Sequence, residues 1–230
     1  MTIMKAIVEK EFKSLFKGFK SIAVIAFFLV VCFAASKFFS NNLDILQKDH
    51  AESAYVSSIR GLVMFLGFLF VLSLSHDAIN REVENQTIRF LVTKSSRSSI
   101  VIGKFLGIFL FWLICILCSF IVIGLFAKQI FVFDFLQIMC FIAYAVSLTI
   151  LISLVIKKPS HTTFVSILLG IALPVLGLWS VSSTKFISEI IKYILPYYYI
   201  LKGGYYIIFP FFLSILMLLI ALAIFQRRDL

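Results

Sequence analysis

SHDAINREVENQTIRFLVTKSSRSSIVIGK, residues 75–104, is the strongly polar stretch that separates two long apolar runs and organises this chain. Four of its side chains are spaced to share one face of a short helix: Val83, Thr87, Phe90 and Leu91. Ser95 and Ser96 can cap a further helix that begins near Arg97. The pattern predicts an amphipathic helix, a turn and then an apolar helix. It leaves two interpretations open: a segment that meets a cytoplasmic partner, or a solvated loop that only connects two spans.

Hydrophobic residues make up 62% of the 230-residue chain, and its mean hydropathy is +1.09. Soluble proteins contain roughly 45–50% apolar residues, and a helix of about 20 apolar residues crosses a bilayer. The sequence therefore predicts an all-α integral membrane protein that forms a single transmembrane domain over residues 1–230. Six spans are predicted, at residues 21–39, 61–79, 100–126, 135–156, 163–181 and 205–225. This layout leaves no room for a soluble catalytic domain.

The formal net charge of +10 does not indicate a nucleic-acid surface, because most of the excess basic residues lie at the predicted cytoplasmic ends of the spans. With the N-terminus inside, twice as many Lys and Arg residues fall on the inner side as on the outer side. Positive residues accumulate in cytoplasmic loops. The distribution therefore predicts a multi-pass protein with both termini in the cytoplasm, and no nucleic acid as a partner.

Two further segments have amphipathic patterns. In residues 1–20 an apolar face opposes four lysines. The apolar set is Val8, Phe12, Leu15, Phe16 and Phe19, and the basic set is Lys10, Lys13, Lys17 and Lys20. This pattern predicts a helix in the membrane interface, with its lysines toward anionic lipid headgroups. Residues 182–204 are rich in tyrosine and predict short interfacial or re-entrant helices, and Pro174 predicts a kink in the fifth span.

The motifs of several enzyme and carrier classes are missing from the sequence. It contains no GxxxxGK[ST] phosphate loop, no HExxH and no GxSxG. No acidic residue falls in the middle of a predicted span, which argues against a carrier driven by protons or sodium. The four cysteines lie in apolar runs and predict neither a metal site nor a redox site. We therefore predict no catalytic residue, metal or cofactor in this chain, and an energy source in a partner.

One family matches the motifs of the polar stretch. The chain resembles the membrane subunit of a type-2 ABC exporter, the ABC-2-type permease, in residues 81–87 (REVENQT), Leu91, Arg97, residues 103–106 (GKFL) and the ending at 225–230. Members of that family typically have an acidic pair, Gly-Thr, a leucine-rich helix, a turn with proline, an arginine and then Gly-Lys. This chain departs from the pattern, because Gln86 stands where glycine is usual and Lys94-Ser95-Ser96 lacks the proline.

The resemblance implies roles for particular residues. Residues 82–91 would form a coupling helix that docks on a separate ATP-binding subunit, which would hold the ATP and magnesium. The residues that would contact or brace that subunit are Glu82, Glu84, Thr87, Arg89, Leu91, Arg97 and Lys104. The N-terminal helix would be the interfacial connecting helix, with Lys10, Phe12, Lys13, Phe16 and Lys17. The location would be the bacterial cytoplasmic membrane, among membrane lipids.

By the same resemblance, two permease chains, identical or related, would pair, and spans two and five would line the path between them. The candidate residues for a translocation path are Phe65, Phe68, Leu69, Leu72 and Pro174. The phenylalanine and leucine side chains among them suit packing or lipid contact equally well. The substrate would be amphipathic or hydrophobic, such as a peptide, an antibiotic or a lipid-like molecule. The alternatives are a non-transporting immunity or sensor protein of the membrane and a membrane-embedded lipid-modifying enzyme, which would need clustered His, Glu or Asp.

Overall fold

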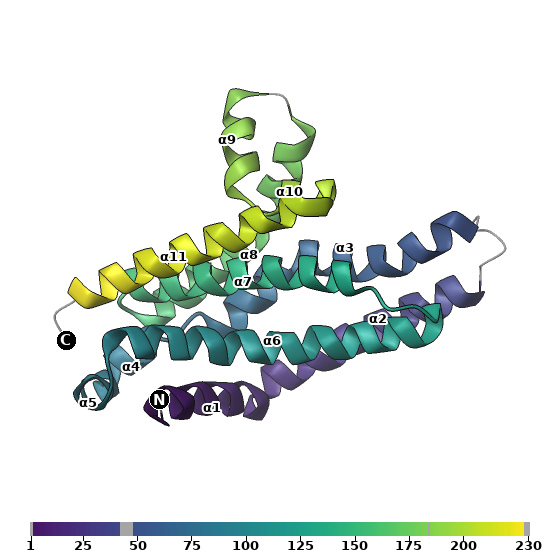
Figure 1. The fold of residues 1–230 in the computed structure, drawn as a ribbon. Coiled ribbons are helices and arrows are strands. Elements are labelled where there is room, and N and C mark those ends of the chain that lie inside the picture. The colour runs from purple at the N-terminus through teal and green to yellow at the C-terminus, as the bar shows by residue number, and fades with distance from the viewer. Residues whose placement is uncertain (1, 42–47, 184, 228–230) are drawn as a thin grey trace.

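The computed structural model describes residues 2–41, 48–183 and 185–227, and all its regular elements are helices (Figure 1). In chain order they are α1 (Thr2–Lys17), α2 (Phe19–Asn41), α3 (Lys48–Ser75), α4 (Asn80–Glu84), α5 (Thr87–Lys94), α6 (Arg97–Ala127), α7 (Val132–Val155), α8 (Pro159–Ser182), α9 (Phe186–Ile194), α10 (Tyr197–Lys202), the 3₁₀ helix η1 (Gly204–Ile207) and α11 (Ile208–Arg227). The all-helical prediction is confirmed. Within these described ranges, six segments are long and apolar enough to cross a membrane, built on α2, α3, α6, α7, α8 and α11.

Helix α7 forms the centre of the bundle and packs against α3, α6, α8 and α11. Its small and hydroxylated residues let its neighbours approach closely. Ser147 and Thr149 donate their hydroxyl protons to carbonyls one turn earlier in α7, so these polar groups do not need water. The hydroxyl oxygens of Ser147 and Ser214 lie 2.6 Å apart and link α7 to α11.

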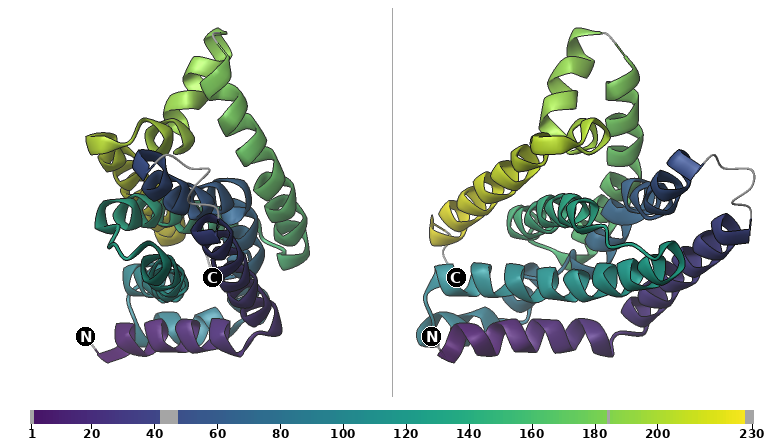
Figure 2. Two further views of the ribbon diagram at one scale, coloured as in Figure 1. Left: turned by 90° about the vertical axis from the view of Figure 1, so that its right-hand side faces the viewer. Right: turned by 45° about the vertical axis from the view of Figure 1, so that its right-hand side comes forward.

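Few residues of α2, α8 and α11 are buried, as expected of helices that face lipid or other chains. The long helices α3, α6, α7 and α11 run side by side, whereas α8 is inclined to them and carries α9 away from the bundle (Figures 1 and 2). The start of α1 and the end of α11 lie at the same end of the bundle as α4 and α5 (Figure 1). An even number of crossings requires both ends on one side, and the structure has that property.

Tyr197 of α10 connects this projecting part to the core. Its hydroxyl donates to the carbonyl oxygen of Met64 in α3 at 2.9 Å, and its ring stacks on Phe68 at a centroid distance of 5.9 Å. Gly177 of α8 lies directly against the same ring, where any side chain would collide with it. Burial raises the pKa of the Tyr197 phenol, so this donor stays protonated across the physiological range.

Helix α3 extends beyond the predicted second span, because it begins at Lys48 rather than near Gly61. Pro174, for which the sequence predicts a kink, is buried inside α8, and the helix continues on both sides of it. In an apolar helix, neighbouring side chains and helices can accommodate a proline.

Candidate coupling site

The polar stretch folds as two short helices, α4 and α5, rather than as the single amphipathic helix that its spacing predicts. The break lies at Gln86, which adopts the left-handed conformation with φ of 57°. The hydroxyl of Thr87 donates to the carbonyl oxygen of Glu82 at 3.2 Å and closes the turn. Glycine reaches this backbone region without strain. The geometry explains why a glycine would be favoured at a position where this chain has Gln86.

This break changes which side chains face the bundle. Ile88, which the helical spacing did not select, is the buried residue of α5, and Val83 and Leu91 pack against the core. Phe90 is 75% exposed, and Thr87 is exposed as well, so the four side chains predicted to share one helix face do not all face the bundle. A large aromatic ring therefore points outward from a short, charged segment.

Four charged side chains form an ion cluster beneath this segment. Lys104 of α6 is only 2% exposed, and its Nζ lies 3.1 Å from Glu11 Oε2 and 3.2 Å from Glu82 Oε2. Glu82 Oε1 also accepts a hydrogen bond of 3.1 Å from Lys10 Nζ. The cluster connects α1, α4 and α6, which are far apart in sequence. Lys104 and Glu82, both predicted as coupling residues, are thus held together and support α4 from within the protein.

Two glycines of α6 allow α1 to approach closely enough for this cluster to form. A Cβ on Gly107 would lie 2.8 Å from the Cβ of Glu11, and one on Gly103 would lie 3.0 Å from a methyl of Ile7. This small-xxx-small spacing is a common device for close helix contact in membranes. Helix α1 crosses the first half of α6 obliquely (Figures 1 and 2).

Helix α1 also shows the two faces that its pattern predicts. Phe12 and Phe16 pack against the core, and the Phe16 ring meets Phe111 edge-on at 5.0 Å. The lysines on the other face are exposed: Lys10, Lys13 and Lys17. Lys20, predicted for the same face, is exposed as well but belongs to α2. Lys13 lies 2.6 Å from Glu9 and lowers the pKa of that carboxyl. Phe19, predicted for the apolar face, belongs to α2 and is exposed.

Arg97 braces a different helix. Its guanidinium donates to the carbonyl oxygens of Phe225 at 2.9 Å and Gln226 at 2.6 Å, at the end of α11. These carbonyls lack partners within their own helix, so a cation there is favourable. The predicted N-cap of α6 is also present, because the Ser96 hydroxyl accepts from the Ser99 N–H at 3.2 Å.

A second buried network, which the sequence analysis missed, ties α4 to α7 and α8. Asn80 is fully buried, and its side-chain amide donates to Thr162 Oγ1 and to the carbonyl oxygen of Ile156. The Ser153 hydroxyl oxygen accepts from the backbone N–H groups of Ile79 and Asn80, at 2.9 and 3.2 Å. An asparagine directly after an apolar run was the only available signal.

Two of the predicted coupling residues are exposed: Glu84 at the end of α4, and Arg89, which precedes Phe90 in α5. The predicted residues therefore form two groups. Glu82, Arg97 and Lys104 pair with other parts of this chain, and Leu91 packs on its core, whereas Glu84, Thr87 and Arg89 remain available at the surface.

The structure also separates the residues predicted for a translocation path. Phe68 and Leu72 are fully buried in the core of this chain, and Pro174 is buried as well. Phe65 is 61% exposed and Leu69 is half-buried, packed against Gly170 of α8. Of the five predicted path residues, Phe65 and Leu69 are the two that are accessible from outside this chain.

The comparison with protein families identifies one match, and it extends over almost the whole chain. The model of the family described as "ABC-2 family transporter protein" matches residues 5–230. No curated protein matches the chain significantly.

Proposed function

This chain belongs to the ABC-2 family of transporter proteins, and on that premise we propose that it is the membrane subunit of an ATP-driven exporter. A separate ATP-binding subunit would dock on α4 and α5 and supply the energy. The observation that carries this proposal is the exposed Phe90, together with the exposed Glu84 and Arg89 of the same α4–α5 segment, which is braced from inside. An aromatic anchor beside charged groups is the composition typical of a binding hot spot.

The bracing makes this surface suitable for transmitting motion. The Glu82–Lys104–Glu11 pairs hold α4 on α6 and α1, and the Asn80 network holds it on α7 and α8. A displacement of the docked subunit would therefore reach four helices rather than a free loop. Domain closure in the partner would then shift the membrane helices as packed bodies.

We further propose that two such chains pair and that their contact includes α3 and α8. One face of α8 presents a row of exposed apolar side chains with helical spacing: Phe164, Leu168, Ile171 and Val175. Phe65 of α3 is exposed as well. Contact with lipid alone would account for an exposed apolar face of this kind. The proposal of a second chain therefore rests on the family and on this apolar row together. The substrate class that suits these surfaces is amphipathic or hydrophobic, such as a peptide, an antibiotic or a lipid-like molecule.

The proposed location is the bacterial cytoplasmic membrane, with both termini in the cytoplasm. The excess of basic residues lies at the end of the bundle that carries α4 and α5, and the positive-inside rule assigns that end to the cytoplasm. The exposed lysines of α1 would then face anionic headgroups of the inner leaflet.

Co-purification tests the proposal. This chain would be tagged and co-expressed with ATP-binding subunits from its own genome, and the readout is a stoichiometric complex with ATPase activity. Phe90→Ala should weaken the complex about tenfold or more, as expected of a hot-spot side chain. Phe186→Ala is the matched control, because Phe186 is equally exposed but lies on α9. If no ATPase associates with the chain, the exporter proposal is overturned and an immunity or sensor role takes its place.

A further inference from the structure

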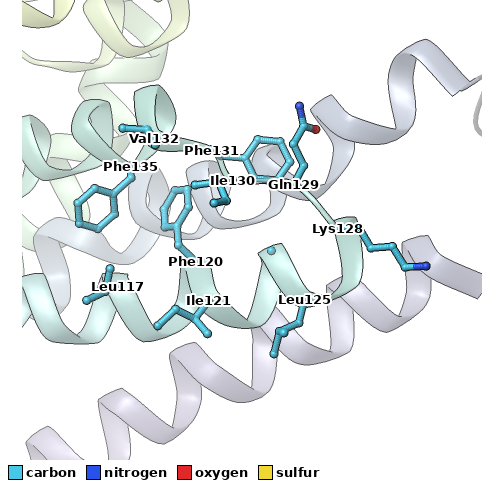
Figure 3. A pocket seen from close by; sticks show the side chains of 11 residues that line it. Leu117, Phe120, Ile121, Leu125, Lys128, Gln129, Ile130, Phe131, Val132 and Phe135 are labelled. Atoms are coloured by element: carbon cyan, nitrogen blue, oxygen red, sulfur yellow. The ribbon is translucent and has the colours of Figure 1, made fainter.

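An open groove of about 460 Å³ lies where α6 ends and α7 begins (Figure 3). Leu117, Ile121 and Leu125 of α6 form one wall, and Phe131, Val132 and Phe135 contribute to the other. The walls are apolar. The polar side chains of the lining, Lys128 and Gln129, lie together in the connection between the two helices.

The groove opens toward the surroundings of the bundle rather than into its core. Its α6 wall belongs to a longer row of exposed side chains on one face of that helix: Leu110, Ile114, Leu117, Ile121 and Leu125. A face of this kind on a membrane-crossing helix meets lipid. An occupant would therefore enter sideways from the bilayer. The part of α6 from Leu117 to Leu125 is about 12 Å long, close to the roughly 15 Å hydrocarbon depth of one leaflet.

The charge at the groove is of one sign. Lys128 is exposed at the end of α6, and within the described part of the chain it forms no ion pair with a carboxylate. Its side chain leads away from the apolar walls, at the end of the groove (Figure 3). A molecule with an apolar chain and an anionic head would place the chain along α6 and the head beside the ammonium group.

We propose that this groove is a binding site for an anionic phospholipid, with one acyl chain along Leu117, Ile121 and Leu125 and the phosphate at Lys128. Van der Waals contact with the apolar walls holds the chain, because the surrounding bilayer is as apolar as the groove. The lysine supplies the preference for an anionic headgroup over a zwitterionic one. The site lies at the opposite end of α6 from the ion cluster of Lys104, so it is independent of the proposed coupling surface.

Native mass spectrometry of the purified full chain tests the headgroup preference. The protein would be equilibrated in detergent with equal amounts of phosphatidylglycerol and phosphatidylethanolamine that carry the same acyl chains. We expect preferential retention of phosphatidylglycerol. Lys128→Gln should reduce that preference about fivefold, since a basic residue near an anionic lipid contributes roughly 1 kcal/mol. Lys128→Arg should keep it, and Lys185→Gln, which removes an exposed lysine on the α9 side, should leave it unchanged.

A second pair of variants tests the position of the acyl chain. Ile121→Trp fills the groove and should lower retention of both lipids severalfold. Leu110→Trp adds the same bulk on the same face of α6 but outside the groove, and should have no effect. Equal losses from Lys128→Gln and Lys185→Gln would show a general surface-charge effect and overturn the site. Unchanged retention in Ile121→Trp would overturn it as well.

Discussion

Replacing Lys104 by methionine should destabilise the protein more than the loss of any exposed charge. Lys104 Nζ is buried between two carboxylates, at 3.1 Å from Glu11 and 3.2 Å from Glu82. Methionine keeps the apolar stem of the side chain but leaves two largely buried anions without their shared cation. Breaking a buried pair in this way typically costs about 3–5 kcal/mol. We expect a value near 3 kcal/mol, because Glu82 keeps its contact with Lys10.

Thermal unfolding in detergent, followed by circular dichroism, measures this effect. For a chain of this size, a loss of about 3 kcal/mol corresponds to a decrease in Tm of roughly 6–12 °C. Lys13→Met is the matched control, because Lys13 pairs with the exposed Glu9 of the same helix α1. Exposed pairs of this kind contribute little to stability, so that variant should unfold within about 2 °C of the wild type.

A charge-neutral variant separates the ion cluster from simple packing. Lys104→Met combined with Glu11→Gln and Glu82→Gln removes the buried charges together, and it should recover most of the lost Tm. Two outcomes would refute the reasoning. One is a decrease below 2 °C for Lys104→Met alone, and the other is a triple variant less stable than the single one.

Four further substitutions, one of them a control, test other parts of the fold by the same unfolding assay. Gln86→Gly should raise stability by about 0.5–1 kcal/mol, because it relieves a left-handed residue; a lower Tm than the wild type would contradict the α4–α5 break. Gly170→Ala should cost about 1–3 kcal/mol, because its Cβ would lie 2.7 Å from the Cα of Leu69. Gly61→Ala is the control: a Cβ at Gly61 would have no atom within 4 Å, so this variant should be neutral or slightly stabilising. Equal changes in stability for Gly170→Ala and Gly61→Ala would refute the close α3–α8 contact. Asn80→Ala should cost about 2–3 kcal/mol through the loss of its buried hydrogen bonds, and a change below 0.5 kcal/mol would show that the network is not formed.

Hydropathy and helical spacing were sufficient to predict the architecture of this chain. Six apolar runs each became a membrane-length helix, because length and composition alone decide whether a helix can cross a bilayer. The opposed faces of α1 were also predictable, since lysines and phenylalanines alternate with the helical period. The Ser96 cap followed from its position directly before an apolar run.

The coupling segment was harder to predict, because its conformation depends on one backbone angle. A helix drawn straight through Gln86 places Phe90 on the core face, whereas the left-handed turn at Gln86 places Ile88 there. Helix propensity does not indicate that a glutamine adopts the left-handed conformation. The available signal was that the family usually has glycine at this position, because glycine marks where the backbone needs a positive φ.

The partners of buried polar groups could not be predicted from local sequence. Lys104 lies two turns inside an apolar helix, which signals that a counter-charge is required, but Glu11 and Glu82 come from distant parts of the chain. The same is true of Arg60 and Asp134. They lie just outside the predicted second and fourth spans, belong to α3 and α7, and form an ion pair of 2.5 Å.

These long-range pairs determine how a force on α4 would spread. At one end of the bundle, Ser153 of α7 accepts hydrogen bonds from the backbone where α4 begins. At the other end, Arg60 of α3 pairs with Asp134 of α7, and Gln137 donates to the carbonyl oxygen of Ile200 in α10 at 2.6 Å. Helix α7 is therefore joined by polar contacts to the start of α4 at one end and to α3 and α10 at the other. A shift of α4 would be carried along α7 to α10, at the far end of the bundle.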